Sequence, residues 1–124
     1  MSAKLPCVIA AFALILMIAA VSINAIYIKR TADNIINMID NAENFGSNSR
    51  EAVILIAEQW KKNILLLRLS LSQKELDDIS LIIDEAQISA NNEDIEEYKK
   101  SMARLKRAIE SIKNREKISI ENIF

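Results

Sequence analysis

The sequence predicts an all-α protein: one N-terminal transmembrane helix followed by a soluble antiparallel helical bundle, or a short helical-repeat array, of about three to four helices. Three observations lead to this prediction. Residues 5–28 carry no charge, the residues after them place apolar side chains at spacings of three and four, and the chain has one glycine and one proline. Because glycine and proline are the residues that most often end helices, their scarcity favours long ones.

The composition restricts the function. A chain of 124 residues fits one domain, and a net charge of −1 gives no support to nucleic-acid binding. There is no histidine, the commonest metal ligand and general base, and a single cysteine cannot form an intrachain disulfide. A phosphate-binding glycine loop and a zinc-type cysteine cluster are also missing. The sequence therefore predicts a non-enzyme with no catalytic, cofactor or metal site and no small-molecule substrate.

The first predicted element is a membrane anchor. The 24 uncharged residues from Leu5 to Ile28 span about 36 Å as a helix, against about 30 Å of hydrocarbon. Tyr27 would lie at the membrane interface, and Lys29 and Arg30 mark the return to water. The predicted organisation is an anchor in the lipid bilayer over 5–28, a helical soluble domain over 29–117 and an apolar C-terminal tail over 118–124.

A cleaved secretory signal is the alternative for this segment. Ala20-Val21-Ser22 resembles a small-residue cleavage site, and cleavage there would release a secreted helical protein. The apolar run continues to Ile28, which favours a retained signal-anchor. Lys4 favours a cytoplasmic N-terminus, whereas Lys29-Arg30 favours the reverse. The short N-terminal tail leads us to expect a single-pass protein of the cell membrane, with the C-terminal domain extracytoplasmic.

Two helical patterns follow the anchor. Residues 31–45 place Ile35, Ile39 and Ala42 on one face, either as a separate helix or as a continuation of the anchor, and Gly46 is expected to end this segment. The next helix is expected to begin at Asn48, with Glu51 completing a capping box. Its core stripe is Ala57, Trp60, Ile64, Leu67 and Leu71.

Two further helices are predicted after Leu71. Ser72 and Glu75 form a capping-box pattern at the start of the third, and Asn91-Asn92 ends it. The fourth carries a regular stripe of Ile95, Tyr98, Met102, Leu105, Ile109 and Ile112. Its acidic start and basic end complement the helix dipole, although a basic surface facing anionic lipid is an alternative interpretation. The short connections predict antiparallel neighbours.

Candidate binding residues come from the second helix and the tail. That helix is apolar on more than one face, so it is either central in its domain or covered by a partner. The apolar tail either packs on the bundle or docks on another protein. The candidate partner-binding residues are Trp60, Leu65, Leu66, Leu69, Ile120, Ile123 and Phe124.

A second candidate cluster contains Ser72, Glu75, Asp77 and Asp78. Glu75 and Asp78 share a helix face, so paired acid–base chemistry or a cation site is conceivable. Capping and N-terminal helix charge explain the same residues, and we favour that interpretation.

Several motifs occur in an order that resembles a known family. An N-terminal anchor precedes Trp60, then Gln73-Lys74-Glu75-Leu76-Asp77-Asp78-Ile79, then Met102-Ala103-Arg104-Leu105, then an ending over residues 118–124. Together they resemble the small bacterial membrane proteins classed as domain of unknown function 4363, found mainly in Firmicutes. Gln73 stands where members commonly have a histidine, which speaks against a role that needs an ionisable ring there.

The resemblance implies a partner subunit rather than an activity. Members tend to be encoded beside multi-pass membrane proteins in spore-forming bacteria. We therefore expect an accessory subunit of a larger membrane or envelope complex, whose partner is a multi-pass membrane protein or a second copy of the chain. A homo-oligomeric structural protein of the envelope is the alternative.

Overall fold

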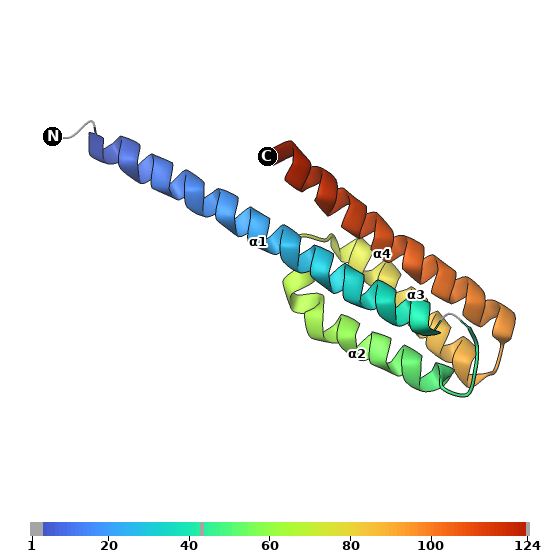
Figure 1. Cartoon of the computed structure of the whole chain (residues 1–124). Coiled ribbons are helices and arrows are strands. Elements are labelled where there is room, and N and C mark those ends of the chain that lie inside the picture. The colour runs from blue at the N-terminus through green and yellow to red at the C-terminus, as the bar shows by residue number, and fades with distance from the viewer. Residues whose placement is uncertain (1–3, 43, 124) are drawn as a thin grey trace.

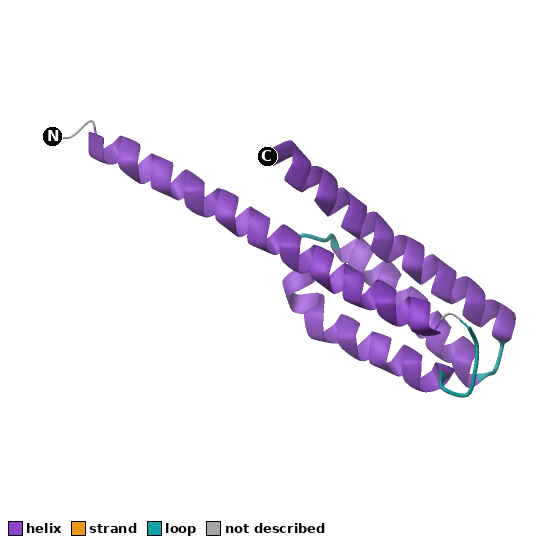
Figure 2. Ribbon diagram, viewed as in Figure 1, coloured by secondary structure: helices purple, strands orange, loops and turns teal. Residues whose placement is uncertain are grey.

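The protein is an up-and-down bundle of four helices with one helix extended far beyond the others. The computed structural model describes residues 4–42 and 44–123, with side chains up to residue 115. Its described helices are α1 (Lys4–Ala42), α2 (Ser49–Leu67), α3 (Gln73–Asn91) and α4 (Ile95–Ile123) (Figure 1). These residues include no strand, and short loops join the helices (Figure 2).

The packing of α4 against α1 distinguishes a bundle from a repeat array. In a helical-repeat array each unit contacts only its neighbours along the chain. Here the last helix lies along the first and closes the bundle, as Figure 1 shows. The predicted all-α bundle is confirmed, and the structure does not support the repeat array.

Helix α1 consists of two parts with different surroundings. From Lys4 to Ile23 every side chain except Ser22 is exposed, and this half stands clear of the bundle (Figure 1). From Ala25 to Ala42 one face is buried, with side chains three or four residues apart forming a wall of the core. Residues 31–45 therefore do not begin a separate helix, since α1 continues through them to Ala42.

Among the described helices, α1 is the one long and apolar enough to cross a membrane, so it is a candidate anchor. The boundary predicted after Ile28 lies inside the bundle, because Ala25 and Ile28 are only 2% and 1% exposed. Side-chain hydrogen bonds also tie this turn to α2, from Asn24 to Ser70 and from Tyr27 to Asn63. The predicted end of the anchor was therefore too late in the chain. Residues 24–28 are as apolar as a membrane segment, so composition alone could not distinguish them from the anchor.

The α1–α2 connection differs from the prediction. Helix α1 ends at Ala42, before Gly46, and Gly46 does not adopt a left-handed backbone conformation. Asn48 makes no side-chain capping bond, so the predicted box with Glu51 is wrong. The Ser49 hydroxyl instead accepts from the Gly46 amide at 2.8 Å, a bond within the connection and not a cap of the first α2 amides.

The other two connections use defined caps. Before α3 the predicted box is confirmed: Ser72 Oγ accepts from the Glu75 amide at 3.2 Å, and Glu75 Oε2 accepts from the Ser72 amide at 2.9 Å. After α3 the chain closes a Schellman-type turn, in which the Asp94 amide donates to Ser89 at 2.9 Å. This turn needs a left-handed residue, and Glu93 supplies it with φ of 55°.

The core is formed by one stripe from each helix. The predicted stripe of α4 is buried from Tyr98 to Ile112, whereas Ile95 is exposed. The Tyr98 hydroxyl donates to the carbonyl of Ala42, which is one of the last carbonyls of α1, and its ring meets Phe45 edge-on at 5.4 Å. Burial raises the pKa of Tyr98. This tyrosine therefore fixes the end of α1 to α4.

Two ion pairs show the register of α4 on α1. Lys106 Nζ lies 2.8 Å from Asp40, and Lys113 Nζ lies 2.6 Å from Asp33. The two helices are therefore antiparallel, since the later residue of α4 pairs with the earlier residue of α1. The end of α4 therefore lies at the end of the bundle from which α1 extends (Figure 1). We call this the anchor end.

The structure also corrects the prediction of a separate C-terminal tail over residues 118–124. Helix α4 runs without a break to Ile123, so residues 118–123 are helical and not a separate segment. The side chains of residues 116–124 lie outside the described part of the chain, which includes those of Ile120, Ile123 and Phe124.

Candidate functional site

The seam between α2 and α3 is held by one large buried side chain. Trp60 is 3% exposed, and its indole Nε1–H donates to Ser80 Oγ at 2.9 Å. Its neighbours Val53, Ile56 and Ala57 are also buried, which fixes the face that α2 turns to the core. Leu67 is buried on the same face, whereas the exposed apolar side chains of α2 are those of Ile54, Leu55, Leu65 and Leu66.

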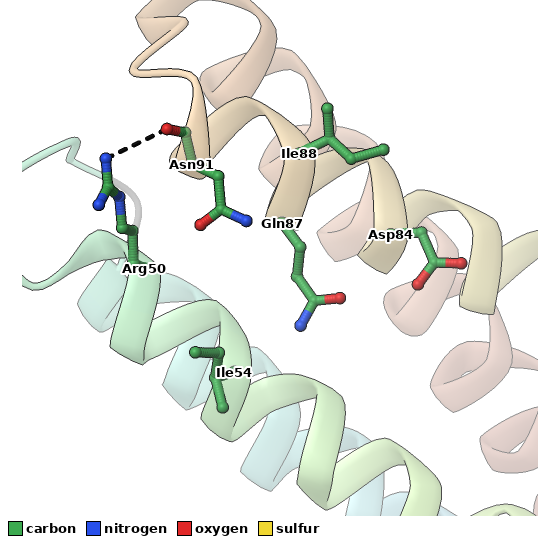
Figure 3. A pocket seen from close by; sticks show the side chains of 6 residues that line it. All are labelled: Arg50, Ile54, Asp84, Gln87, Ile88 and Asn91. Atoms are coloured by element: carbon green, nitrogen blue, oxygen red, sulfur yellow. Dashed lines mark hydrogen bonds between the residues drawn. The ribbon is translucent and has the colours of Figure 1, made fainter.

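An open hollow of about 460 Å³ lies along this seam, towards the end away from the anchor. Arg50 and Ile54 line it from α2, and Asp84, Gln87, Ile88 and Asn91 line it from α3 (Figure 3). Ile54 and Ile88 leave apolar surface exposed on its two sides, at 47% and 59%.

The guanidinium of Arg50 is already engaged at one end of this hollow. It donates to the carbonyls of Ala90 at 3.4 Å and Asn91 at 3.1 Å, and it lies 3.6 Å from the Glu93 carboxylate. A cation at the last carbonyls of a helix is stabilising, so Arg50 has a structural role at the end of α3. Figure 3 shows the bond to Asn91 as a dashed line.

A second hollow continues the seam towards the anchor end. Its volume is about 190 Å³, and it is lined by Trp60, Lys61 and Ile64 from α2 and by Ser80, Ile83 and Asp84 from α3, together with Ala57. Asp84 borders both hollows, so they form one interrupted groove. We call it the α2–α3 groove.

The groove combines apolar surface with a few polar groups at its edges. Such a surface is suited to an apolar segment of another protein, with polar contacts at the rim. No group of three or more His, Cys, Asp or Glu side chains among the described residues could hold a metal ion. The groove is therefore a candidate interaction surface.

A separate apolar feature lies at the anchor end of α2. Leu65 is 70% exposed, Leu66 51% and Leu69 76%, although all three are large apolar side chains. They occupy the last turn of α2 and the start of the α2–α3 connection. We call these three residues the leucine corner.

The carboxylates at the start of α3 form a cap and an ion pair. Glu75 completes the capping box, and the guanidinium of Arg115 on α4 donates to its other oxygen. The hydrogen bond from Arg115 holds the pKa of Glu75 below its ordinary value, against the opposite effect of partial burial. Asp77 accepts from Gln73 at 2.8 Å, and Asp78 is exposed. The geometry agrees with the capping interpretation.

Removing the charge of Glu75 is expected to flatten the acid dependence of stability. A depressed folded-state pKa contributes stability above the unfolded-state value of about 4.3 and loses it as the pH falls through the folded-state pKa. Glutamine keeps the capping box, so Glu75→Gln removes only the ion pair. We expect a loss of about 0.5–1 kcal/mol at pH 7 that disappears at low pH.

Urea unfolding of the full chain in detergent, followed by circular dichroism between neutral and acidic pH, measures this effect. Asp77→Asn is the matched control, because Asp77 bonds to the neutral Gln73. If Glu75→Gln and the native chain lose stability in parallel on acidification, the ion pair does not contribute.

Four of the seven predicted partner-binding residues have side chains in the described part of the chain, and these four divide into two groups. Leu65, Leu66 and Leu69 are exposed, so they remain candidates. Trp60 is buried in the core, so its predicted availability to a partner is not supported.

One exposed apolar surface was not predicted from the sequence. The outer face of α3, with Leu81 at 55% and Ile88 at 59% exposed, was missed. These two residues stand seven apart, off the core stripe of α3, and that spacing was the available signal.

A comparison with known protein families assigns the chain to one of them. The family model described as domain of unknown function (DUF4363) matches residues 22–123. The chain belongs to this family. The DUF4363 match includes the whole bundle, the groove and the leucine corner, and it confirms the resemblance at the level of the family. Neither a curated protein nor a solved structure matches the chain.

Proposed function

We propose that this DUF4363 protein is a single-pass membrane subunit whose bundle is an interaction module for another membrane or envelope protein, without catalysis of its own. The observation that supports this most strongly is the course of α1. Its first 20 residues stand clear of the bundle with apolar side chains exposed, while its remainder packs in the core. Surface this apolar is stable only in lipid or against another protein. One continuous helix would therefore hold the bundle at the membrane.

The α2–α3 groove is the surface we assign to the protein partner. It lies on the side of the bundle opposite the seam between α1 and α4. Ile54 and Ile88 supply apolar contact area, and Asp84 and Gln87 supply polar groups around them. Charged residues at the centre of an interface are disfavoured, so a lysine at either isoleucine would oppose docking.

The proposal is tested by purifying the tagged protein at native expression from a mild detergent extract. We expect a partner to co-purify with the native chain and to be lost from the Ile54→Lys, Ile88→Lys double variant. Leu55→Lys is the matched control, because Leu55 is equally exposed on α2 but does not line the groove. A clean monomer without a co-purifying protein contradicts the proposal, and a homo-oligomer would replace it with self-assembly.

We also propose that the bundle lies outside the cytoplasm. Lys99 is exposed on α4 and far from the span, so Lys99→Cys in a Cys7→Ser background is a suitable reporter. A membrane-impermeant thiol reagent is expected to label it in intact cells. Labelling only after lysis would reverse the proposed orientation.

A further inference from the structure

The level of the leucine corner relative to the membrane follows from α1, if α1 spans the bilayer as proposed. The exposed stretch from Lys4 to Ile23 has a helical length of about 30 Å, which equals the thickness of the hydrocarbon layer. Asn24 then lies at the edge of that layer. Its side-chain amide donates to Ser70 Oγ, so the α2–α3 connection lies at the same level.

A second bond supports this placement. The Tyr27 hydroxyl, one turn further along α1, donates to Asn63 on α2. The two bonds fix the last turns of α2 beside residues 24–27, with the helices running in opposite directions. The leucine corner falls between Asn63 and Ser70, the two residues bonded to α1. Because α1 is one continuous helix, the leucine corner lies at the bilayer surface.

The charges around the leucine corner match a lipid surface. From Lys61 to Lys74, both included, the chain carries four basic residues and no carboxylate. The carboxylates that follow belong to the first turns of α3, where Glu75 pairs with Arg115. Lys62 and Arg68 are exposed and flank the leucines along the chain. Basic residues next to exposed apolar ones are typical of segments that lie in the headgroup layer, since the cations meet phosphates while the apolar groups enter the acyl boundary.

We propose that the leucine corner is a lipid-docking surface: Leu65, Leu66 and Leu69 enter the interface of the bilayer that α1 crosses, and Lys62 and Arg68 face anionic headgroups. The bundle then meets the membrane at two points, the end of the span and the leucine corner, which restricts the tilt of α1 in the bilayer. The α2–α3 groove then runs outward from the bilayer surface, with its larger hollow at the end of the bundle away from the membrane. The inference rests on the proposed membrane span.

Fluorescence from single labelled positions tests the docking in the full chain. Leu69→Cys, Leu55→Cys and Ile15→Cys are made in a Cys7→Ser background, labelled with the dye NBD and reconstituted into vesicles of phosphatidylcholine and phosphatidylglycerol. All three native side chains are exposed, so the label does not disturb the core. A nitroxide-bearing lipid then reports contact with the bilayer by quenching.

We expect a blue-shifted, lipid-quenched signal at positions 15 and 69 and a water-like signal at position 55. A water-like signal at 69 with quenching retained at 15 overturns the docking and leaves the membrane span intact. A label at 69 that is shielded from water yet not quenched by lipid means that a second copy covers the corner, and also overturns it. A water-like signal at 15 removes the proposed span itself.

Discussion

Replacing Trp60 with alanine is expected to lower the free energy of unfolding by about 3–5 kcal/mol. The indole is 3% exposed and fills the seam between α2 and α3, so its removal leaves a large cavity. It also leaves Ser80 Oγ without the indole N–H that lies 2.9 Å away. Both effects destabilise the folded state.

Urea unfolding of the full chain in detergent, followed by the helical circular dichroism signal, measures this loss. Trp60→Phe keeps most of the packing and is expected to cost less than the alanine variant. Leu55→Ala, at an exposed position of the same helix, should change stability by no more than about 0.5 kcal/mol. Equal effects of Trp60→Ala and Leu55→Ala would show that Trp60 is not part of the core.

A second large effect is expected where the exposed apolar stretch of α1 enters the bundle. Ile28 is 1% exposed and packs in the bundle, whereas Ile26, two positions earlier in the same helix, is 53% exposed. We expect Ile28→Ala to destabilise the bundle by about 2–5 kcal/mol. Ile26→Ala removes the same atoms from an exposed position, so its cost should be much smaller.

The same unfolding experiment compares the two variants, and carbonate extraction of membranes provides the control. Both variants keep the exposed stretch from Lys4 to Ile23, so both are expected to stay in the membrane fraction. If the two substitutions destabilise the chain equally, the turn from Asn24 to Ile28 belongs to the membrane span and not to the bundle.

Local features of the chain could be predicted from the sequence. The α4 stripe from Tyr98 to Ile112 has regular helical spacing, and the structure buries it as expected. The capping box of Ser72 and Glu75 joins residues three apart, so its geometry depends only on the start of one helix. The apolar character of residues 5–23 follows from composition alone.

The remaining features depend on contacts between residues far apart in the chain. Periodicity places Trp60 on a helix face, but only the packing of α3 against α2 decides that this face is buried and that Ile54 and Ile88 border a groove. Likewise, Ile28 resembles any anchor residue until α2 and α4 are placed beside α1.

The sequence by itself therefore determined which segments up to Ile112 are helical and where the candidate anchor begins. Only the tertiary structure decided where the candidate anchor ends, which apolar side chains stay exposed, and that Arg115 pairs with Glu75. The physical reason is that helical periodicity and capping act within one turn, whereas burial requires a second element to remove a surface from water.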